Sequence, residues 1–404
     1  MNKRAFNGIK VLDFCWVVIG PMLTRYLADF GAEVIRVESQ SRLETLRLSQ
    51  PFKDGIPGVN RSAYFSNYNV NKYGITVNMN ADDAHAFMLP LIKWADVVTD
   101  NFTPGVMEKW GMGPEELHSI NPNLVTFSAS MLGRKGPESQ QPGYGPVLTS
   151  LAGLSSVTGW PDRPASSPYG AYTDFLLPHL AISAISAALI QARHTGKGTH
   201  IDLSQLEASL QYLSPMILDT QVNERIPNRM GNKDTQIAPH SVYRCKGEDN
   251  WLALACETNE QWKSLCKIIG NQSLVNDNMF ISNEKRKLNE IELDNLIESW
   301  TITFDPFELM EICQRNGIPS GVVQSCQDLF NDDQLKHREH FVRIDHPEIG
   351  PHATDTNAFT LSSTPAEYTR HAPLLGEHNE WVCKQILGLN DESIKQLYRN
   401  GVLE

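Results

Sequence analysis

The sequence is short of positive charge, and this shortage excludes a class of protein. Lysine and arginine number 35 against 47 aspartates and glutamates, which gives a formal net charge of −12. A nucleic-acid-binding protein needs a basic face, so this balance argues against that class. An anionic small ligand stays open, because a local group of basic side chains can bind phosphates within an acidic protein.

Paired cysteines and a secretion signal are also lacking. The seven cysteines are widely spaced without any C-x-x-C, which predicts reduced thiols and a cytoplasmic protein rather than a disulfide framework or a zinc site. The N-terminal residues lack the apolar stretch and cleavage site of a signal peptide. We interpret His337, His340 and His346 as surface residues near a helix end, so no metal is expected.

Long apolar runs are lacking except at residues 175–192. A membrane-spanning helix needs roughly 20 predominantly apolar residues. This stretch contains Pro178, His179, two serines and Gln191. We therefore interpret it as a buried helix of a soluble protein.

Three catalytic or nucleotide-binding motifs are absent. Residues 14–21, between the first predicted strand and helix, lack G-x-G-x-x-G, so no dinucleotide is expected even though Glu38 stands where a ribose-binding acid would. The chain has no G-x-S-x-G elbow and no P-loop, which argues against a serine hydrolase and a P-loop nucleotidase.

The apolar pattern that is present predicts a Rossmann-like α/β domain. Residues 9–13 and 33–37 are expected to be strands joined by a helix at 20–29, and such a β-α-β unit favours a parallel sheet covered by helices. The further elements expected in this domain are strands at 95–99, 124–128 and 199–203, helices at 83–94, 179–194 and 378–388, and a loop-rich stretch with many glycines and prolines at 133–170.

The pattern changes after about residue 225. Residues 240–256 are expected to form a hairpin, followed by helices near 258–269, 283–299 and 305–316 and a strand at 318–323. We predict a smaller α+β domain at 226–325, inserted into a large domain that consists of residues 1–225 and 326–404.

Asp174 stands alone among apolar residues, directly before the predicted helix at 179–194. Its carboxylate would suit the N-cap of that helix. The same position, next to glycine and aromatic residues, would suit a nucleophile that faces a cleft. The two roles are compatible, because a helix N-terminus stabilises an anion. An aspartate with the ordinary pKa of about 3.9 is ionised at neutral pH, as a nucleophile must be.

The order of ten segments carries more information than any single motif. They are GIKVLDF (8–14), LADFGAEVIRVE (27–38), NVNKYGITVNM (69–79), ADVVTDNFTPGVMEKWGMG (95–113), NPNLVTFSASMLGRKGP (121–137), GYGPV (143–147), TDFLLPHLAISAISAALIQARHTGKGTHIDLSQLEA (173–208), GIPSGVV (317–323), LSSTP (361–365) and APLLGEHN (372–379). In this order the chain resembles the CaiB/BaiF family, the class III or formyl-CoA transferase-like CoA-transferases.

The resemblance implies a Rossmann-like large domain, a small domain and two chains threaded into an interlocked dimer. It implies transfer of CoA from an acyl-CoA donor to a free carboxylic acid, with Asp174 as the carboxylate that is loaded through a mixed anhydride and an aspartyl-CoA thioester. CoA is then a substrate, and no permanently bound cofactor is expected. Water must be kept from the anhydride, and N–H groups must face each tetrahedral oxyanion.

The family pattern also implies CoA contacts. Lys72 and Lys109 are predicted to contact the CoA phosphates or the adenine pocket, with Arg36, Asn101 and Arg134 as further candidates. For each of them the alternative is an ordinary surface residue.

Two departures from the family pattern lie near the acyl group. Pro178 stands where many members have glycine, and no glycine-run loop occurs between residues 225 and 260 to cover the intermediate. The segment TDFLLP is closer to members that act on aromatic or succinate-type acids. The side chains near Asp174 favour an apolar or aromatic acid; they are Tyr169, Tyr172, Phe175, Leu176 and Leu177.

Two alternatives stay open. An α-methylacyl-CoA racemase would share the fold, but the histidine expected of it in GYGPV is Tyr144 here, a poor base at neutral pH. A non-catalytic subunit that completes a hetero-oligomer with an active paralogue is favoured by Pro178 and opposed by Asp174.

Overall fold

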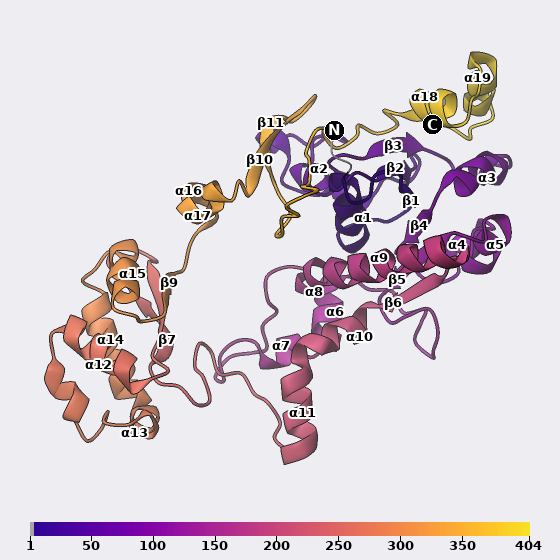
Figure 1. Cartoon of the computed structure of the whole chain (residues 1–404). Coiled ribbons are helices and arrows are strands. Elements are labelled where there is room, and N and C mark those ends of the chain that lie inside the picture. The colour runs from indigo at the N-terminus through magenta and orange to yellow at the C-terminus, as the bar shows by residue number, and fades with distance from the viewer. Residues whose placement is uncertain (1–3) are drawn as a thin grey trace. The chain divides into compact units, whose positions relative to one another are not determined.

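The computed structural model describes residues 4–404 and divides into two compact units (Figure 1). The larger unit consists of the described residues up to Ser155, Ser167–Ile226 and Lys336–Glu404. The smaller unit consists of Ser156–Ser166 and Pro227–Leu335. Apart from Ile226, the small domain predicted at 226–325 lies within this smaller unit, which also includes α16 (Cys326–Asn331) and part of the loop before Asp174.

A six-stranded parallel sheet forms the centre of the larger unit, with the strand order β3-β2-β1-β4-β5-β6. Its strands are β1 (Lys10–Asp13), β2 (Glu33–Glu38), β3 (Tyr73–Thr76), β4 (Val97–Asp100), β5 (Val125–Ser130) and β6 (His200–Ser204). The predicted parallel α/β sheet is confirmed, and β3 adds an edge strand that the sequence did not indicate. The order reverses between β1 and β4, and ligands of open α/β sheets bind at such a point, outside the carboxyl ends of the strands.

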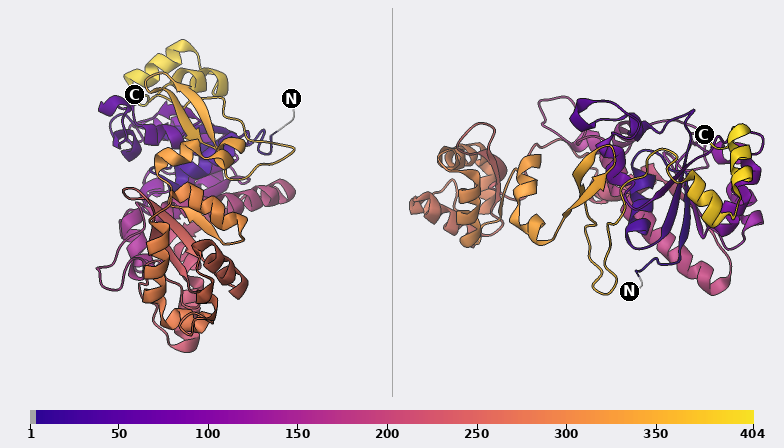
Figure 2. Two further views of the ribbon diagram at one scale, coloured as in Figure 1. Left: turned by 90° about the vertical axis from the view of Figure 1, so that its left-hand side faces the viewer. Right: turned by 90° about the horizontal axis from the view of Figure 1, so that it is seen from above.

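Side chains of each strand alternate between two apolar layers, as strand geometry requires. Val11 and Val34 face α1 (Ile19–Asp29) and α9 (Pro178–Thr195). The next residues, Leu12 and Ile35, face the opposite layer with α3 (Ala84–Trp94) and α19 (Asp391–Arg399). The right-hand view in Figure 2 shows the pink α9 and the yellow C-terminal helices on opposite sides of the strands.

The remaining elements of the larger unit include several short helices that the sequence did not indicate. The elements are α2 (Ala63–Tyr68), α4 (Val106–Lys109), α5 (Pro114–Ile120), α6 (Gly145–Leu151), α8 (Tyr172–Leu176), α10 (Gln205–Leu210), α11 (Ser214–Asn223), α18 (Asn379–Trp381), β10 (Phe341–His346) and β11 (Gly350–Asp355). Two further helices, α7 (Leu154–Val157) and α17 (Asp333–His337), each include residues of both units. The stretch 133–170 is mostly loop, as predicted, and it also contains the short helices α6 and α7. Pro146 in the first turn of α6 is favourable in a helix, although Gly-Pro reads as a turn. The helix near 378–388 is also followed by a further one, α19.

The apolar stretch at 175–192 is helical, as expected, but only one stripe of it is buried. Ala181, Ile185 and Leu189 recur at helical spacing and pack on the sheet, whereas Ile190 is exposed. By length and composition, the described segment Tyr172–Thr195 would also suit a membrane span. Its packing against β5 and α1 in the larger unit favours a role as a core helix.

The smaller unit has its own core around an antiparallel sheet, β7-β8-β9. Its elements are β7 (His240–Arg244), β8 (Trp251–Ala255), β9 (Ser320–Val322), α12 (Asn259–Ile269), α13 (Asn283–Leu288), α14 (Glu290–Thr301) and α15 (Pro306–Arg315). The predicted hairpin is confirmed, and the predicted helix at 283–299 is divided at Asn289. Trp262, Leu293 and Leu309 are fully buried against the sheet.

A network of buried charges lies beneath the carboxyl ends of β1 and β2. Three acids and three bases, all less than 5% exposed, balance one another; they are Asp13, Glu38, Glu44, Arg36, Arg47 and Lys72. Arg36 Nη2 donates to Glu44 Oε2 at 2.7 Å, and Arg36 Nη1 donates to Cys15 O at 2.8 Å. The other oxygen of Glu44 accepts from the Val17 N–H at 2.6 Å. The network therefore fixes the turn that follows β1.

Substitution Glu44→Gln should lower the free energy of unfolding by about 3 kcal/mol, because it leaves Arg36 buried with one partner fewer. Urea denaturation at pH 7 measures this change. The matched control is Glu380→Gln, whose side chain is 70% exposed beside Lys384 and should change stability by less than about 0.5 kcal/mol. Equal effects of the two variants would show that the network does not hold the fold.

Candidate active site

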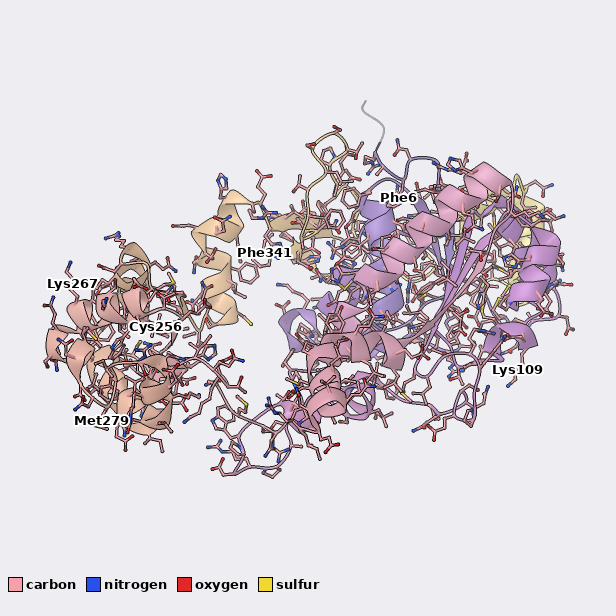
Figure 3. All side chains as sticks on the ribbon, turned by 60° about the horizontal axis from the view of Figure 1, so that its bottom comes forward. Phe6, Lys109, Cys256, Lys267, Met279 and Phe341 are labelled. Atoms are coloured by element: carbon pink, nitrogen blue, oxygen red, sulfur yellow. The ribbon has the colours of Figure 1, made fainter. Side chains whose placement is uncertain are left out.

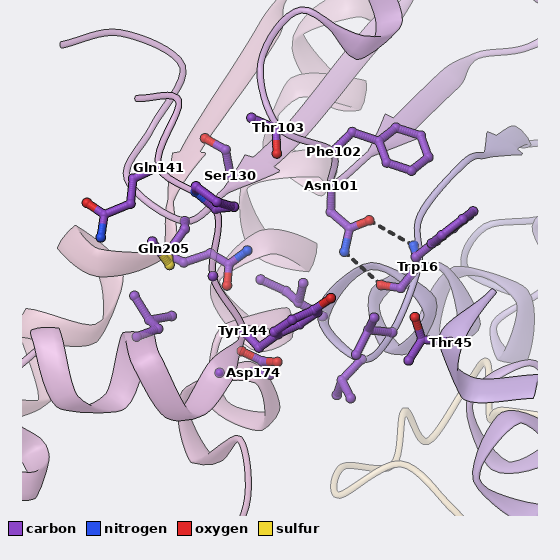
Figure 4. Close-up of a pocket in the computed structure, with 18 of the residues that line it drawn as sticks. Trp16, Thr45, Asn101, Phe102, Thr103, Ser130, Gln141, Tyr144, Asp174 and Gln205 are labelled. Atoms are coloured by element: carbon purple, nitrogen blue, oxygen red, sulfur yellow. Dashed lines mark hydrogen bonds between the residues drawn. The ribbon is translucent and has the colours of Figure 1, made fainter. Parts of the chain in front are cut away.

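A cavity of about 400 Å³ lies at the carboxyl edge of the parallel sheet, within the larger unit (Figure 4). Its walls come from the turn after β1, the loop after β4, the end of β5, the loop before α6, and the starts of α8 and α10. Asp174 lines it, together with Tyr144, Ser130 and Gln205. This position at the reversal of strand order is the one that the fold favours for a ligand.

A second cavity of about 370 Å³ adjoins the first and shares Trp16, Arg42, Phe102 and Thr103 with it. The guanidinium of Arg42 lies 5.4 Å from the centre of the Trp16 ring, a cation–π contact. Lys109, an exposed side chain of α4 labelled in Figure 3, lines the second cavity. Asp174 lines the first cavity, Lys109 and Glu38 line the second, and Arg42 lies in the part that both share.

Asp174 is only 7% exposed and lies in the first turn of α8. Its N–H donates to Ala171 O at 2.9 Å, and Ala171 is the N-cap of this helix. The following helix, α9, begins at Pro178. The interpretation of Asp174 as the cap of the long helix is therefore wrong: the short helix α8 places its carboxylate at the cavity instead.

Burial raises the pKa of Asp174 to about 7, well above the ordinary value for aspartate. No neighbouring positive charge offsets this effect, and Oδ1 has no hydrogen-bond partner. The expectation of an ordinary pKa for Asp174 is thus corrected by its surroundings. Burial also raises the pKa of the nearby Tyr64 to about 12, and the negative charge of Asp174 adds to that shift. Near neutral pH, Asp174 exchanges between a carboxylic acid and a poorly solvated carboxylate, a reactive nucleophile.

Gly145, the first residue of α6, makes room for this carboxylate. A Cβ atom there would lie 2.2 Å from Ala171 Cβ and 2.9 Å from Asp174 Oδ2, closer than atoms can approach. The GYGPV segment therefore matters at this position because it brings backbone, without a side chain, against Asp174.

The turn after β1 forms the wall opposite and is held under strain. Val17 has a φ of 65°, which a β-branched residue rarely adopts. The side-chain amide of Asn101 holds Trp16, the residue before Val17, through two hydrogen bonds. Its Oδ1 accepts from Trp16 N at 2.8 Å, and its Nδ2 donates to Trp16 O at 2.7 Å (Figure 4). Asn101 lines the cavity, and both polar atoms of its side chain form the hydrogen bonds that shape this turn.

Of the predicted CoA contacts, Lys109 and Asn101 line the cavities and three others do not. Lys72 and Arg36 are fully buried, and Lys72 Nζ is bonded to Asp13, Thr24, Asn69 and Pro21 O. Neither side chain is accessible to CoA in this structure, so burial gives them a structural role. Arg134 forms an ion pair with Glu108 outside both cavities.

Arg42 was missed, because the family pattern marks nothing at that position. Its only signal was a basic residue in the loop that follows β2, close to the strand edge where ligands bind.

The side chains thought to favour an aromatic acid do not line the cavity. Tyr169 is 93% exposed, Phe175 packs near Tyr68, and Leu177 is in the core. The cavity instead has uncharged hydrogen-bonding side chains around Asp174, namely Thr45, Asn101, Thr103, Ser130, Ser139, Gln141, Tyr144 and Gln205. This lining suits a polar acyl group.

Comparison with known proteins identifies the family. The model of CoA-transferase family III matches residues 6–379, and the chain belongs to this family. The succinate–glutarate CoA-transferase of Agrobacterium fabrum is 30% identical over 387 residues, which cover 95% of this chain and 96% of that protein. The succinyl-CoA–D-citramalate CoA-transferase of Chloroflexus aurantiacus is 28% identical over 400 residues, 99% of this chain and 98% of that protein.

A solved structure agrees. The crystal structure of a CaiB/BaiF family protein from Brucella suis superposes with a TM-score of 0.87 at 28% identity and covers 96% of this chain and 100% of that one. The resemblance drawn from the ten ordered segments is confirmed, and the protein is a class III CoA-transferase enzyme.

The raised pKa of Asp174 predicts a pH-dependent stability. Its folded-state pKa of about 7 lies above the unfolded value, so the folded state binds the extra proton and this stabilisation is lost as the pH rises through 7. Asp174→Asn, which cannot ionise, should stabilise the protein by about 2–4 kcal/mol more at pH 8 than at pH 4. Urea denaturation of both proteins at the two pH values measures this difference, and an equal effect at both would contradict the shift.

Proposed function

We propose that this enzyme moves CoA from an acyl-CoA donor to a free dicarboxylic acid of the succinate type, with Asp174 as the covalently loaded residue. The observation that carries the proposal is the Asp174 carboxylate, buried in a cavity with one oxygen unpartnered. The polar lining of this cavity supports a polar acyl group. The relatives whose names include succinyl-CoA, glutarate and D-citramalate support the dicarboxylic class.

The reaction proceeds through two acyl exchanges on Asp174. An oxygen of the carboxylate attacks the donor thioester carbon, the C–S bond breaks, and a mixed anhydride and CoA thiolate form. The thiolate attacks the aspartyl carbon of the anhydride, which releases the donor acid and leaves an aspartyl-CoA thioester. The acceptor carboxylate then attacks this thioester, and the same steps in reverse give the new acyl-CoA and free Asp174.

Desolvation of Asp174 serves this chemistry in two ways. The carboxylate has lost hydration, so it attacks more readily than one in water. The raised pKa also means that the rate constant kcat/KM should rise with pH and level off above about 7, since only the ionised form attacks.

CoA would lie along the two adjoining cavities. Arg42 and Lys109 are the bases available there for its phosphates, and Trp16 offers a flat apolar face beside Arg42. CoA arrives and leaves as a substrate, so we propose no permanently bound cofactor.

We further propose that the enzyme works as an interlocked homodimer in the cytoplasm. Support for a second copy comes from the exposed apolar side chains of α11 in the larger unit, among them Met216, Ile217, Leu218 and Val222. Such side chains on one short helix favour coverage by protein. A paralogous chain in place of the second copy is the alternative that leads to a hetero-oligomer.

The two rival functions make different demands on the cavity. A racemase needs a base that removes an α-proton, and the residues lining the cavity include no histidine; Tyr144, at the position in question, is 72% exposed. A non-catalytic subunit has no need of a shaped pocket around Asp174. Deuterium incorporation into the α-position of a 2-methylacyl-CoA would favour the racemase.

Substitution Asp174→Ala should reduce CoA transfer from succinyl-CoA to a panel of free acids by at least about a thousandfold, because among residues 4–404 no other carboxylate lines the first cavity. Mass spectrometry of the CoA esters measures transfer, and hydroxylamine added during turnover should convert Asp174 to its hydroxamate. The matched control is Asp162→Ala at an exposed site, which should keep full activity. Full transfer by Asp174→Ala would overturn the proposal.

Substitutions Arg42→Ala and Lys109→Ala should each raise the KM for acyl-CoA about tenfold with little change in kcat, because each removes a charge-assisted contact made in both the ground and transition states. Initial rates against acyl-CoA concentration give both constants. Lys197→Ala, a base outside both cavities, is the control. A fall in kcat at constant KM would assign the two residues to the chemical step instead.

A further inference from the structure

The loop at residues 131–143 forms one wall of the Asp174 cavity. Met131 and the stretch from Ser139 to Gly143, apart from Gln140, line the cavity. The two ends of this loop touch: a Cβ atom on Gly143 would lie 2.3 Å from Met131 Sδ, so the thioether occupies the space that a side chain would need. A surface loop of this length whose two ends lie close together has the form of an Ω-loop, a type often found at functional sites.

Arg134 fastens this loop to the sheet. Its backbone N–H donates to both carboxylate oxygens of Asp202 in β6 at 3.2 Å. Its Nη1 donates to Ser128 Oγ in β5 at 3.3 Å, and its Nη2 pairs with Glu108 in α4. The Arg134 side chain is 11% exposed, and its guanidinium joins the loop to β5 and α4, while its backbone N–H joins the loop to β6.

The surroundings of Arg134 make it unsuited to bind CoA phosphates. Glu108 pairs with its guanidinium, and Asp202 accepts from its backbone N–H. A third carboxylate, Asp100, is close enough to feel its charge: burial raises the pKa of Asp100 to about 6, and Arg134 offsets part of that rise. Ser128 donates to this same Asp100 at 2.6 Å. A phosphate beside Arg134 would meet these carboxylates, and Arg134 lies outside the lining of both cavities.

We infer that Arg134 is a positioning residue, which holds the 131–143 loop over Asp174 so that water does not reach the covalent intermediates. This inference rests on the proposed function. The step that the loop prevents is hydrolysis: water adds to the anhydride or the aspartyl-CoA thioester, the acid or CoA leaves, and the Asp174 carboxylate returns with no new CoA ester. In this proposal, the 131–143 loop covers the covalent intermediate, since the chain has no glycine-run segment at 225–260 that could do so.

The test is the ratio of hydrolysis to transfer in the whole enzyme. With succinyl-CoA as donor and glutarate as acceptor, free CoA reports hydrolysis and glutaryl-CoA reports transfer. In Arg134→Ala this ratio should rise at least about tenfold, with the KM for succinyl-CoA changed less than twofold. Arg134→Lys, which keeps the charge, should give an intermediate ratio, and Lys135→Ala, an exposed neighbour, should leave it unchanged.

Since the ratio compares two products of the same active molecules, a partly misfolded preparation does not alter it. An unchanged ratio in Arg134→Ala, or a raised KM for succinyl-CoA without extra hydrolysis, would overturn the inference; the second result would make Arg134 a CoA contact. Failure of the parent enzyme to form an Asp174 hydroxamate would count against the proposed function instead, because it concerns loading and does not involve the loop.

Discussion

Removal of water from one carboxylate is the constraint on which the site depends. Asp174 lies in a short helix against the cavity wall, and its burial without a counter-charge is the cause of its raised pKa. A salt bridge there would lower the pKa but would also hold the oxygens that must react. Burial of this unpaired acid costs folding free energy, but it provides a nucleophile that changes charge near neutral pH.

The surrounding structure serves to shape the space around that acid. Gly145 supplies backbone without a side chain, and the strained turn at Val17 is held in place by Asn101 and Glu44. The buried charges behind the turn neutralise one another, so they can support it without attracting or repelling a ligand strongly. Lys72 and Arg36, which the sequence predicted as CoA contacts, belong to this buried support.

Much of the fold was predictable because the strands of a parallel sheet are buried and therefore appear in the sequence as short apolar runs rich in β-branched residues, such as Val11 and Val34. The position of Asp174 was predictable from the order of segments, but its environment was not. A sequence shows that an aspartate precedes an apolar helix; it does not show that α8 intervenes or that Oδ1 lacks a partner. The same limit applies to Lys72 and Arg36, since the family pattern marks a position without distinguishing a buried base from an exposed one. The helices within 145–157 were missed because glycine and proline are frequent in that stretch. Arg42 was missed because no sequence pattern marks its position.

In the covalent route, an oxygen of Asp174 exchanges with an oxygen of the acids that pass through the site. Turnover with an acceptor acid labelled with ¹⁸O in its carboxylate tests it most directly, since the anhydride oxygen stays with the aspartate when CoA takes the acyl group. Mass spectrometry of the peptide that contains Asp174 should then show ¹⁸O in its side chain after formation of the acceptor CoA ester. Formation of that ester with no ¹⁸O in Asp174 would contradict the covalent route.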